Sequence, residues 1–317
     1  MAVYTQVSAE AASALLARYD VGKLIAMKGI AEGVENSNFL LETDQSRFIL
    51  TLYESRTNPA DLPYFHDLLA HLHARGCLVP RFIEDREGRW LQDVAGRKGC
   101  LIEFLSGVSV SEPQADVAYN VGSALGAVHA ALDGFNQSRP NPLSLNDWRP
   151  LFDKCDPSQS DILHPGLTAR IAAECDYLES SWPNNLPTSA IHGDLFPDNV
   201  LTLDGQVTGL IDFYFACTDA RAFDLAVTHA AWSFNADGSV YNPAIGDAIV
   251  AGYLNQVVLN DAERSALPIL ARGACLRFLL TRLYDWINTP LDAMVSRKDP
   301  LAFLRRLDHY TAHRLVA

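Results

Sequence analysis

The side chains best suited to chemistry lie in one stretch, 191–213. His192 and Asp194 are followed, five residues after the aspartate, by Asn199, and thirteen residues further on an apolar run ends at Asp212. Mg²⁺ prefers oxygen ligands and keeps several waters, so a carboxylate and an amide oxygen suit it. Phosphoryl transfer also needs a carboxylate facing the acceptor hydroxyl. We therefore expect Asn199 and Asp212 to hold Mg²⁺ and Asp194 to orient the acceptor and take its proton.

Each of these residues has a structural alternative. Asp and Asn are common turn formers, and any one of them alone is more typical of a turn than of a site. Their joint spacing, with an apolar strand before Asp212, favours phosphoryl transfer. His192 is expected to support the loop through hydrogen bonds and not to act as a base.

The elements that must position this stretch change character along the chain. The first hundred residues predict short strands and one inserted helix, which Asn58 caps and Gly76 ends. The expected strands are 24–30, 38–42, 48–53, 81–84, 89–92 and 100–105. From Ser111 the apolar period is helical, with 136–150 expected as a connection and later helices near 166–181, 222–235, 243–258, 262–287 and 300–315. The fold class is therefore α+β, with an antiparallel N-terminal lobe (1–105) and a mainly helical lobe (106–317).

Composition narrows the class of protein. The chain has 317 residues, 49% of them hydrophobic and 20% charged, which is typical of a globular enzyme. Its 25 basic and 38 acidic side chains give a formal charge of −13, which makes nucleic acid and anionic membranes poor partners. The six cysteines include no CxxC pair, which disfavours a zinc site or a disulfide framework. No run reaches the ~18–20 apolar residues that cross a bilayer, and we expect a cytoplasmic protein.

The segment I-H-G-D-L-F-P-D-N-V-L (191–201) and the later I-D-F resemble known catalytic and metal-binding segments. These belong to the aminoglycoside-phosphotransferase and choline-kinase superfamily, which is related to the protein kinases. The resemblance covers nearly the whole chain and implies the protein-kinase-like two-lobe fold, with ATP as the phosphoryl donor. It implies that Glu103 and Leu105 offer main-chain groups to adenine. It also implies that Asp224 braces the catalytic loop, where a plain helix N-terminal carboxylate is the alternative.

Three further segments, 29–39, 48–54 and 277–285, resemble the bacterial homoserine kinases within that superfamily. This resemblance implies L-homoserine as the substrate, phosphorylated on its side-chain hydroxyl in threonine biosynthesis. The first segment does not contain G-x-G-x-x-G, so we expect successive main-chain N–H groups to bind the phosphates. The nucleotide-binding residues expected there are Gly33, Glu35, Asn36, Ser37 and Asn38.

The third strand departs from the pattern of the superfamily. Alignment places Thr51 where a lysine would pair with the α- and β-phosphates, and threonine brings a hydrogen bond without a charge. We still expect Thr51 to contact the nucleotide. Lys28 or Arg47 is the alternative source of positive charge.

An amino-acid acceptor presents a carboxylate and an ammonium group. An arginine fork binds a carboxylate through two parallel hydrogen bonds. We expect Arg277 first, and Arg282 second, to do so, with internal or solvated arginines as the alternative. Further walls of the pocket are expected at Asp198, Tyr214 and Trp286. The oligomeric state does not follow from the sequence.

Two other functions compete with this interpretation. The first is a kinase of the same fold that acts on choline, ethanolamine, a sugar or an aminoglycoside. The second is an inactive nucleotide-binding pseudokinase, which Thr51 suggests. Because Asp194, Asn199 and Asp212 are all present, the pseudokinase is disfavoured.

Overall fold

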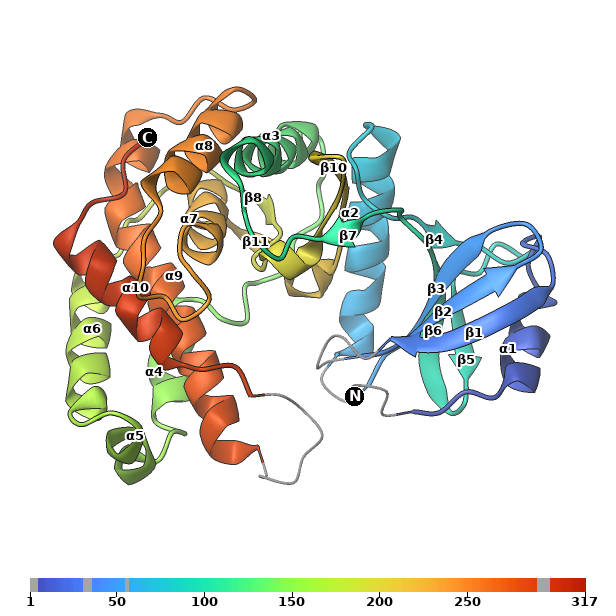
Figure 1. Ribbon diagram of the computed structural model, residues 1–317, viewed down its shortest axis with the longest axis horizontal. Helices are drawn as coiled ribbons and strands as arrows, with labels where there is room; N and C mark the ends of the chain where they lie inside the picture. Colours follow the sequence, from blue (N-terminus) through green and yellow to red (C-terminus); the bar gives the residue numbers. More distant parts are fainter. Residues whose placement is uncertain (1–4, 31–35, 55–56, 290–296) are drawn as a thin grey trace. The chain divides into compact units, whose positions relative to one another are not determined.

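The structure is a computed structural model that describes residues 5–30, 36–54, 57–289 and 297–317. The chain divides into two compact units, Met1–Gly107 and Val108–Ala317 (Figure 1).

The N-terminal unit is built on an antiparallel sheet. Its strand order is β1-β2-β3-β6-β4, and β5 pairs with β6. The strands are β1 (Leu24–Ile30), β2 (Ser37–Thr43), β3 (Arg47–Leu52), β4 (Phe82–Ile83), β5 (Leu91–Val94) and β6 (Arg97–Glu103). The turn expected at 85–88 between the stretches 81–84 and 89–92 is present, since the N–H of Gly88 donates to the carbonyl oxygen of Asp85 at 2.9 Å, and β4 and β5 each pair with β6. The Asp85 carboxylate stabilises this turn, because it accepts hydrogen bonds from the N–H groups of Glu87 and Arg89.

Two helices complete this unit. Helix α1 (Ala9–Leu16), which the sequence analysis did not predict, is capped by the Ser8 side chain and buries Leu15 and Leu16 in a cluster with the sheet. Helix α2 (Leu62–Ala74) follows a 3-10 turn, Pro59–Asp61, that Asn58 caps. Gly76, at φ +79°, lies just beyond its end.

The C-terminal unit is mainly helical, and short strands are inserted around the stretch expected to carry the chemistry. Strands β7 (Val108–Ser109), β9 (Val200–Leu203) and β10 (Gln206–Leu210) form one sheet, and β8 (Thr188–Ile191) pairs with β11 (Cys217–Ala220). The helices are α3 (Ala115–Ala131), α4 (Leu145–Phe152), α5 (Pro157–Leu163), α6 (Leu167–Ser181), α7 (Arg221–Trp232), α8 (Pro243–Leu254), α9 (Asp261–Asn288) and α10 (Leu301–Ala312).

The expectation that 136–150 is only a connection is wrong at its end. Ser144 and Asp147 form a reciprocal capping box, which satisfies the exposed N–H groups of a helix start, and α4 begins there. Pro150 falls inside this helix.

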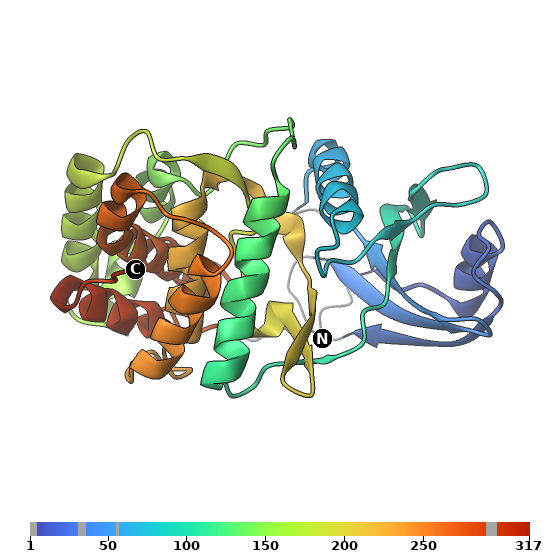
Figure 2. The same cartoon turned by 90° about the horizontal axis from the view of Figure 1, so that it is seen from above.

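Helices α3 and α8 lie against each other with their backbones in close approach (Figure 2). A Cβ at Gly252 would lie 2.0 Å from the carbonyl oxygen of Tyr119, and one at Gly122 would lie 2.1 Å from that of Ile249. Only glycine permits this contact, which fixes α3 against α8. None of the described helices has the length and apolar character that a membrane crossing requires.

Candidate active site

The loop after β8 brings three of the predicted residues together. Asn199 donates from Nδ2 to the carbonyl oxygen of Asp194 at 2.8 Å, and the same nitrogen is 3.3 Å from Asp194 Oδ2. The main chain of Asn199 accepts from the N–H of Ile211, next to Asp212, at 3.0 Å. Because the amide nitrogen is committed to the loop, the amide oxygen of Asn199 is left to act as a ligand.

His192 joins the two ends of this arrangement. The N–H of Asp194 donates to His192 Nδ1 at 3.2 Å, so that nitrogen carries no proton. His192 Nε2 then donates to the carbonyl oxygen of Ile211 at 3.0 Å. Burial lowers the pKa of His192, against the attraction of Asp224. A neutral histidine with both nitrogens engaged therefore supports the loop.

Asp224 anchors the start of the loop from α7. Its fully buried carboxylate accepts from the N–H groups of His192 and Gly193, at 2.7 and 2.8 Å, and from His129 Nε2 at 3.2 Å. Burial would raise the pKa of Asp224, but the His129 hydrogen bond and the main-chain donors hold it below its usual value. His129 on α3 is fixed in turn by the hydroxyl of Tyr253, at 2.9 Å. His129 and Tyr253 were not predicted, because their spacing in the sequence carries no signal.

Gly193 must be glycine because its φ is +74° and a Cβ would lie 3.3 Å from the carbonyl oxygen of Phe215. Asp212 also has a positive φ, 64°, although it is not glycine. Such a conformation costs of order 1–3 kcal/mol and is concentrated at functional sites. Its presence at Asp212 is consistent with a constraint imposed by ligand binding.

The carboxylates at this loop repel one another. Burial raises the pKa of Asp194 to about 8; Arg277 opposes the rise, and Asp212 and Asp198 add to it. Asp212 is exposed to solvent. The protein around its carboxyl group and the negative charge of Asp198 nevertheless raise its pKa to about 6. A cation placed between these carboxylates would relieve the repulsion.

The donor set fits a hard divalent cation. Among the described residues no three His, Cys, Asp or Glu side chains are grouped as a metal site. Mg²⁺ does not need such a group, since it binds through one or two protein oxygens together with phosphates and waters. The carboxylate of Asp212 and the amide oxygen of Asn199 are residues of this kind.

The residues predicted to bind the acceptor are placed differently from one another. Arg277 on α9 donates from Nη1 to the carbonyl oxygen of Gly193. Arg282 lies over the rings of Phe196 and Phe303, and burial lowers its pKa to about 10. Three further predicted residues surround the loop less closely: Asp198, which is exposed and 3.4 Å from Lys298, Tyr214, just after Asp212, and Trp286, whose ring lies under Arg297.

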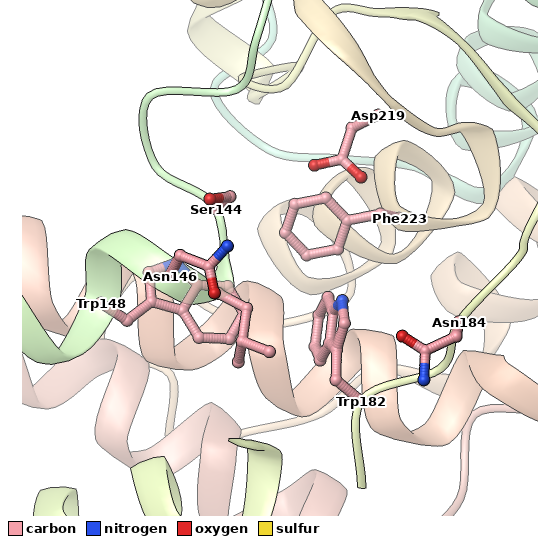
Figure 3. Close-up of a pocket in the computed structure, with 8 residues that line it drawn as sticks. Ser144, Asn146, Trp148, Trp182, Asn184, Asp219 and Phe223 are labelled. Carbon is pink, nitrogen blue, oxygen red and sulfur yellow. The ribbon is translucent and has the colours of Figure 1, made fainter. Parts of the chain in front are cut away.

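A cavity of about 250 Å³ lies elsewhere in this unit (Figure 3). Its wall includes Trp148, Trp182 and Phe223, which pack edge to face, with Asp219 at the rim. None of the residues predicted for the site lines it. The predicted chemistry is therefore gathered on the loop 192–199 and not in this cavity.

In the N-terminal unit, Gly33 and Glu35 lie outside the described residues. The side chains of the other loop residues are used within the sheet. Ser37 donates to Glu54 at 2.8 Å, and Asn36 accepts from the hydroxyl of Thr57 at 3.1 Å. Thr51 donates to Asn38 Oδ1 at 2.7 Å.

Two further nucleotide-binding residues were expected at the end of β6. The N–H of Glu103 donates to the carbonyl oxygen of Arg81 at 2.9 Å, and its side chain pairs with Arg81 at 3.2 Å. Leu105 lies beyond the end of the strand. The main-chain role expected of these residues stays a prediction.

Strand register locates the alternative source of positive charge. Leu50 and Leu52 face the cluster with α1, so Thr51 faces the opposite side of the sheet. Lys28 pairs with Leu40 and Leu40 with Ile49, which places the exposed Lys28 on the Thr51 side as well. Arg47 is also on that side, but its guanidinium lies 4.3 Å from the ring centroid of Phe104.

Residues 26–264 match the model of the phosphotransferase enzyme family. The chain belongs to this family. A homoserine kinase of Azorhizobium caulinodans is 51% identical over 317 residues, which cover 100% of this chain and 97% of that one. A homoserine kinase of Gluconobacter oxydans is 50% identical over 312 residues, 98% of both chains.

Solved structures share the fold of this phosphotransferase at low sequence identity. Amicoumacin kinase, solved with AMP-PNP and Ca²⁺, has a TM-score of 0.72 at 14% identity and covers 96% of this chain and 97% of its own. Choline kinase of Cryptosporidium parvum has a TM-score of 0.66 at 14% identity, covering 96% and 95%. The predicted protein-kinase-like α+β fold is confirmed, and the chain is a small-molecule kinase that uses ATP with a divalent metal ion.

Proposed function

We propose that this phosphotransferase is a homoserine kinase, which transfers the γ-phosphoryl group of ATP to the side-chain hydroxyl of L-homoserine in threonine biosynthesis. The observation that carries the choice of substrate is the identity of about half of all residues, over the full length, with homoserine kinases. The site supports the same chemistry, because Asp194 and Asn199 share the loop after β8, and the segment that carries Asp212 is hydrogen-bonded to that loop through Ile211 and Asn199.

Asp194 is proposed to receive the hydroxyl of the acceptor and to take its proton. Its position is set by three of its neighbours, since Asn199 holds its carbonyl oxygen, His192 its N–H, and Arg277 the preceding carbonyl. Asn199 and Asp212 would hold Mg²⁺, which supplies charge neutralisation to the phosphates when bound.

The N-terminal unit, taken as 1–105, is proposed to bind the nucleotide, and the unit 106–317 to bind the acceptor. Glu103 and Leu105 would offer main-chain groups to adenine, and main-chain N–H groups around Glu35 to Asn38 would face the phosphates. The charge that Thr51 does not supply is assigned to Lys28, on the same side of the sheet. We propose that the enzyme acts in the cytoplasm, where ATP is made available.

A coupled assay of ADP release, run over a panel of acceptors with Mg·ATP, tests this proposal. The panel holds L-homoserine, choline, ethanolamine and an aminoglycoside, and a parallel series replaces Mg²⁺ with EDTA or Ca²⁺. We expect turnover that depends on homoserine and on Mg²⁺. Strong turnover of choline or an aminoglycoside, with none of homoserine, would assign the protein to another substrate class.

A further inference from the structure

Two arginines of the C-terminal unit, Arg221 and Arg272, each bind a buried carboxylate through the Nε–Nη2 edge of the guanidinium. Arg221 donates from Nε and Nη2 to Glu263, at 2.6 and 2.9 Å. Arg272 uses the same two nitrogens on Glu174, at 2.8 Å each. In this arrangement the guanidinium makes two parallel hydrogen bonds to the carboxylate, which also neutralises its positive charge.

Arg277 differs from these arginines. It is only 4% exposed, and the one hydrogen bond that it makes to a described residue goes from Nη1 to the carbonyl oxygen of Gly193. Its Nε is buried without a partner, and across the described residues neither Nη2 nor the charge has a hydrogen-bonding or ion-pairing partner. A buried guanidinium left unpaired in this way is costly, because both the charge and the N–H groups lose water.

Arg306 shows that an unpartnered Nε alone does not distinguish Arg277 from the other buried arginines. Its Nε is also unpaired, but its two terminal nitrogens donate to the carbonyl oxygens of Ala302 and Asn235, at 2.8 and 3.0 Å. Arg277 has the whole Nε–Nη2 edge left over. That edge is the one with which Arg221 and Arg272 hold carboxylates.

The unpaired edge of Arg277 belongs to a side chain that lies close to Asp194. Arg277 donates to the carbonyl oxygen of Gly193, the residue before Asp194. The positive charge of Arg277 also interacts electrostatically with the Asp194 carboxyl group. The rings of Phe278 and Phe215 lie 4.6 and 5.7 Å from the guanidinium carbon. The cation is therefore held next to the residue proposed to face the acceptor hydroxyl.

We propose that the Nε–Nη2 edge of Arg277 binds the α-carboxylate of an amino-acid acceptor while the acceptor hydroxyl faces Asp194. The proposal rests on the proposed function and adds the residue that selects an amino acid over an amino alcohol. Rejection follows from the same contact, because an acceptor without a carboxylate would leave the buried guanidinium unpaired.

The test measures binding, so that it does not depend on turnover. L-homoserine and L-homoserine amide are titrated at pH 7 into protein saturated with a non-hydrolysable ATP analogue and Mg²⁺, and Kd is obtained by calorimetry. We expect the wild-type protein to prefer the acid by about 100-fold, since a charge-assisted fork is lost with the amide. In Arg277→Met the two ligands should bind almost equally, and Arg277→Lys should keep part of the preference.

The remaining outcomes overturn the assignment in distinguishable ways. If wild-type protein binds both ligands equally, or if Arg277→Met weakens both by the same factor, Arg277 serves only to hold Gly193. If Arg282→Met abolishes the preference and Arg277→Met does not, Arg282 is the carboxylate ligand. If wild-type protein binds neither ligand, the proposed substrate itself is wrong. Binding of the ATP analogue reports that each variant is folded.

Discussion

The loop 192–199 and the sheet face around Thr51 hold their polar groups in different ways. Around the loop, the fully buried Asp224 binds two main-chain N–H groups, and the buried His192 connects two segments. On the sheet face, Thr51 and Asn38 bond to each other, and Lys28, a lysine on that side, is exposed.

This contrast separates two ways of building a site. The loop places reacting side chains through a network of buried hydrogen bonds, so a change at any member affects position as well as chemistry. The sheet face offers main-chain groups and a surface charge, so single side chains there should be easier to replace. Substitutions in the two regions should therefore differ in their effects, with the largest at the loop.

Replacing Asp194 with alanine should have the largest effect. We expect the kcat for homoserine to fall by about 10²–10⁴-fold, because the group that takes the proton is removed. The affinity for nucleotide should change little. Steady-state ADP release and nucleotide binding measure the two quantities. Asp247→Ala is the control, because Asp247 is an exposed aspartate on α8 and away from the predicted site residues; an equal loss of kcat in both variants would contradict the assignment of the base.

Asp224→Asn tests the anchor of the loop. Asparagine presents one acceptor oxygen and an NH₂ group to three donors, so at least one buried N–H loses its partner. We expect the free energy of unfolding to fall by about 3–5 kcal/mol, and kcat by about 100-fold at most through misplacement of Asp194. Urea denaturation and the ADP assay measure these effects.

The surface pair Arg149–Asp176 provides the control for that experiment, since Asp176 is 74% exposed. Asp176→Asn should change stability by less than about 1 kcal/mol. If Asp224→Asn proves as mild as Asp176→Asn, Asp224 is a helix-terminal carboxylate and not an anchor.

The catalytic loop could be predicted from the sequence better than the contacts that hold it. The residues of the loop are side chains of unusual type at fixed spacing, so His192, Asp194, Asn199 and Asp212 were all selected, and the structure brings them together. His129 escaped prediction because it reaches Asp224 from a distant helix, and nothing local to either residue encodes that contact.

The fold shows the same limit in its connections. The apolar and aromatic runs of β1–β3 and the helical spacing of apolar residues in α9 marked the positions of these elements. Helix α4 was missed because Pro and Asn dominate its surroundings, although its capping box is local. The pairing of β4 and β5 with β6, and not with each other, depends on contacts across the sheet that short strands do not encode.

Lys28→Met tests the sheet face. If Lys28 supplies the charge that Thr51 lacks, the KM for ATP should rise by about 5–10-fold, as expected for a partly exposed charge-assisted contact, with a smaller change in kcat. Lys23→Met is the control, because Lys23 is an exposed lysine just before the same strand. Equal KM values in the two variants would leave the phosphates to main-chain groups alone. Thr51→Val should disturb only the hydrogen bond with Asn38.

The last expected effect is on stability in acid, and it belongs to the C-terminal unit. Burial lowers the pKa of His229 from 6.5 to about 3, and its Nδ1 is 2.6 Å from the hydroxyl of Tyr310. The unfolded chain takes up this proton near pH 6.5 and the folded protein does not. The neutral His229 therefore stabilises fully above pH 6.5, and its contribution falls as the pH drops from 6.5 toward 3.

The raised pKa values of Asp194 and Asp212 act in the opposite direction over part of this range, so the comparison must be with a variant. The difference in unfolding free energy between wild type and His229→Gln should shrink below pH 6.5, by at most about 1.4 kcal/mol per pH unit. Tyr310→Phe removes the hydroxyl but keeps the titrating ring, so it should lose stability at pH 7 and retain the pH dependence. Parallel curves for wild type and His229→Gln would place the acid sensitivity elsewhere, and hydrogen exchange would then show whether the N-terminal unit opens first.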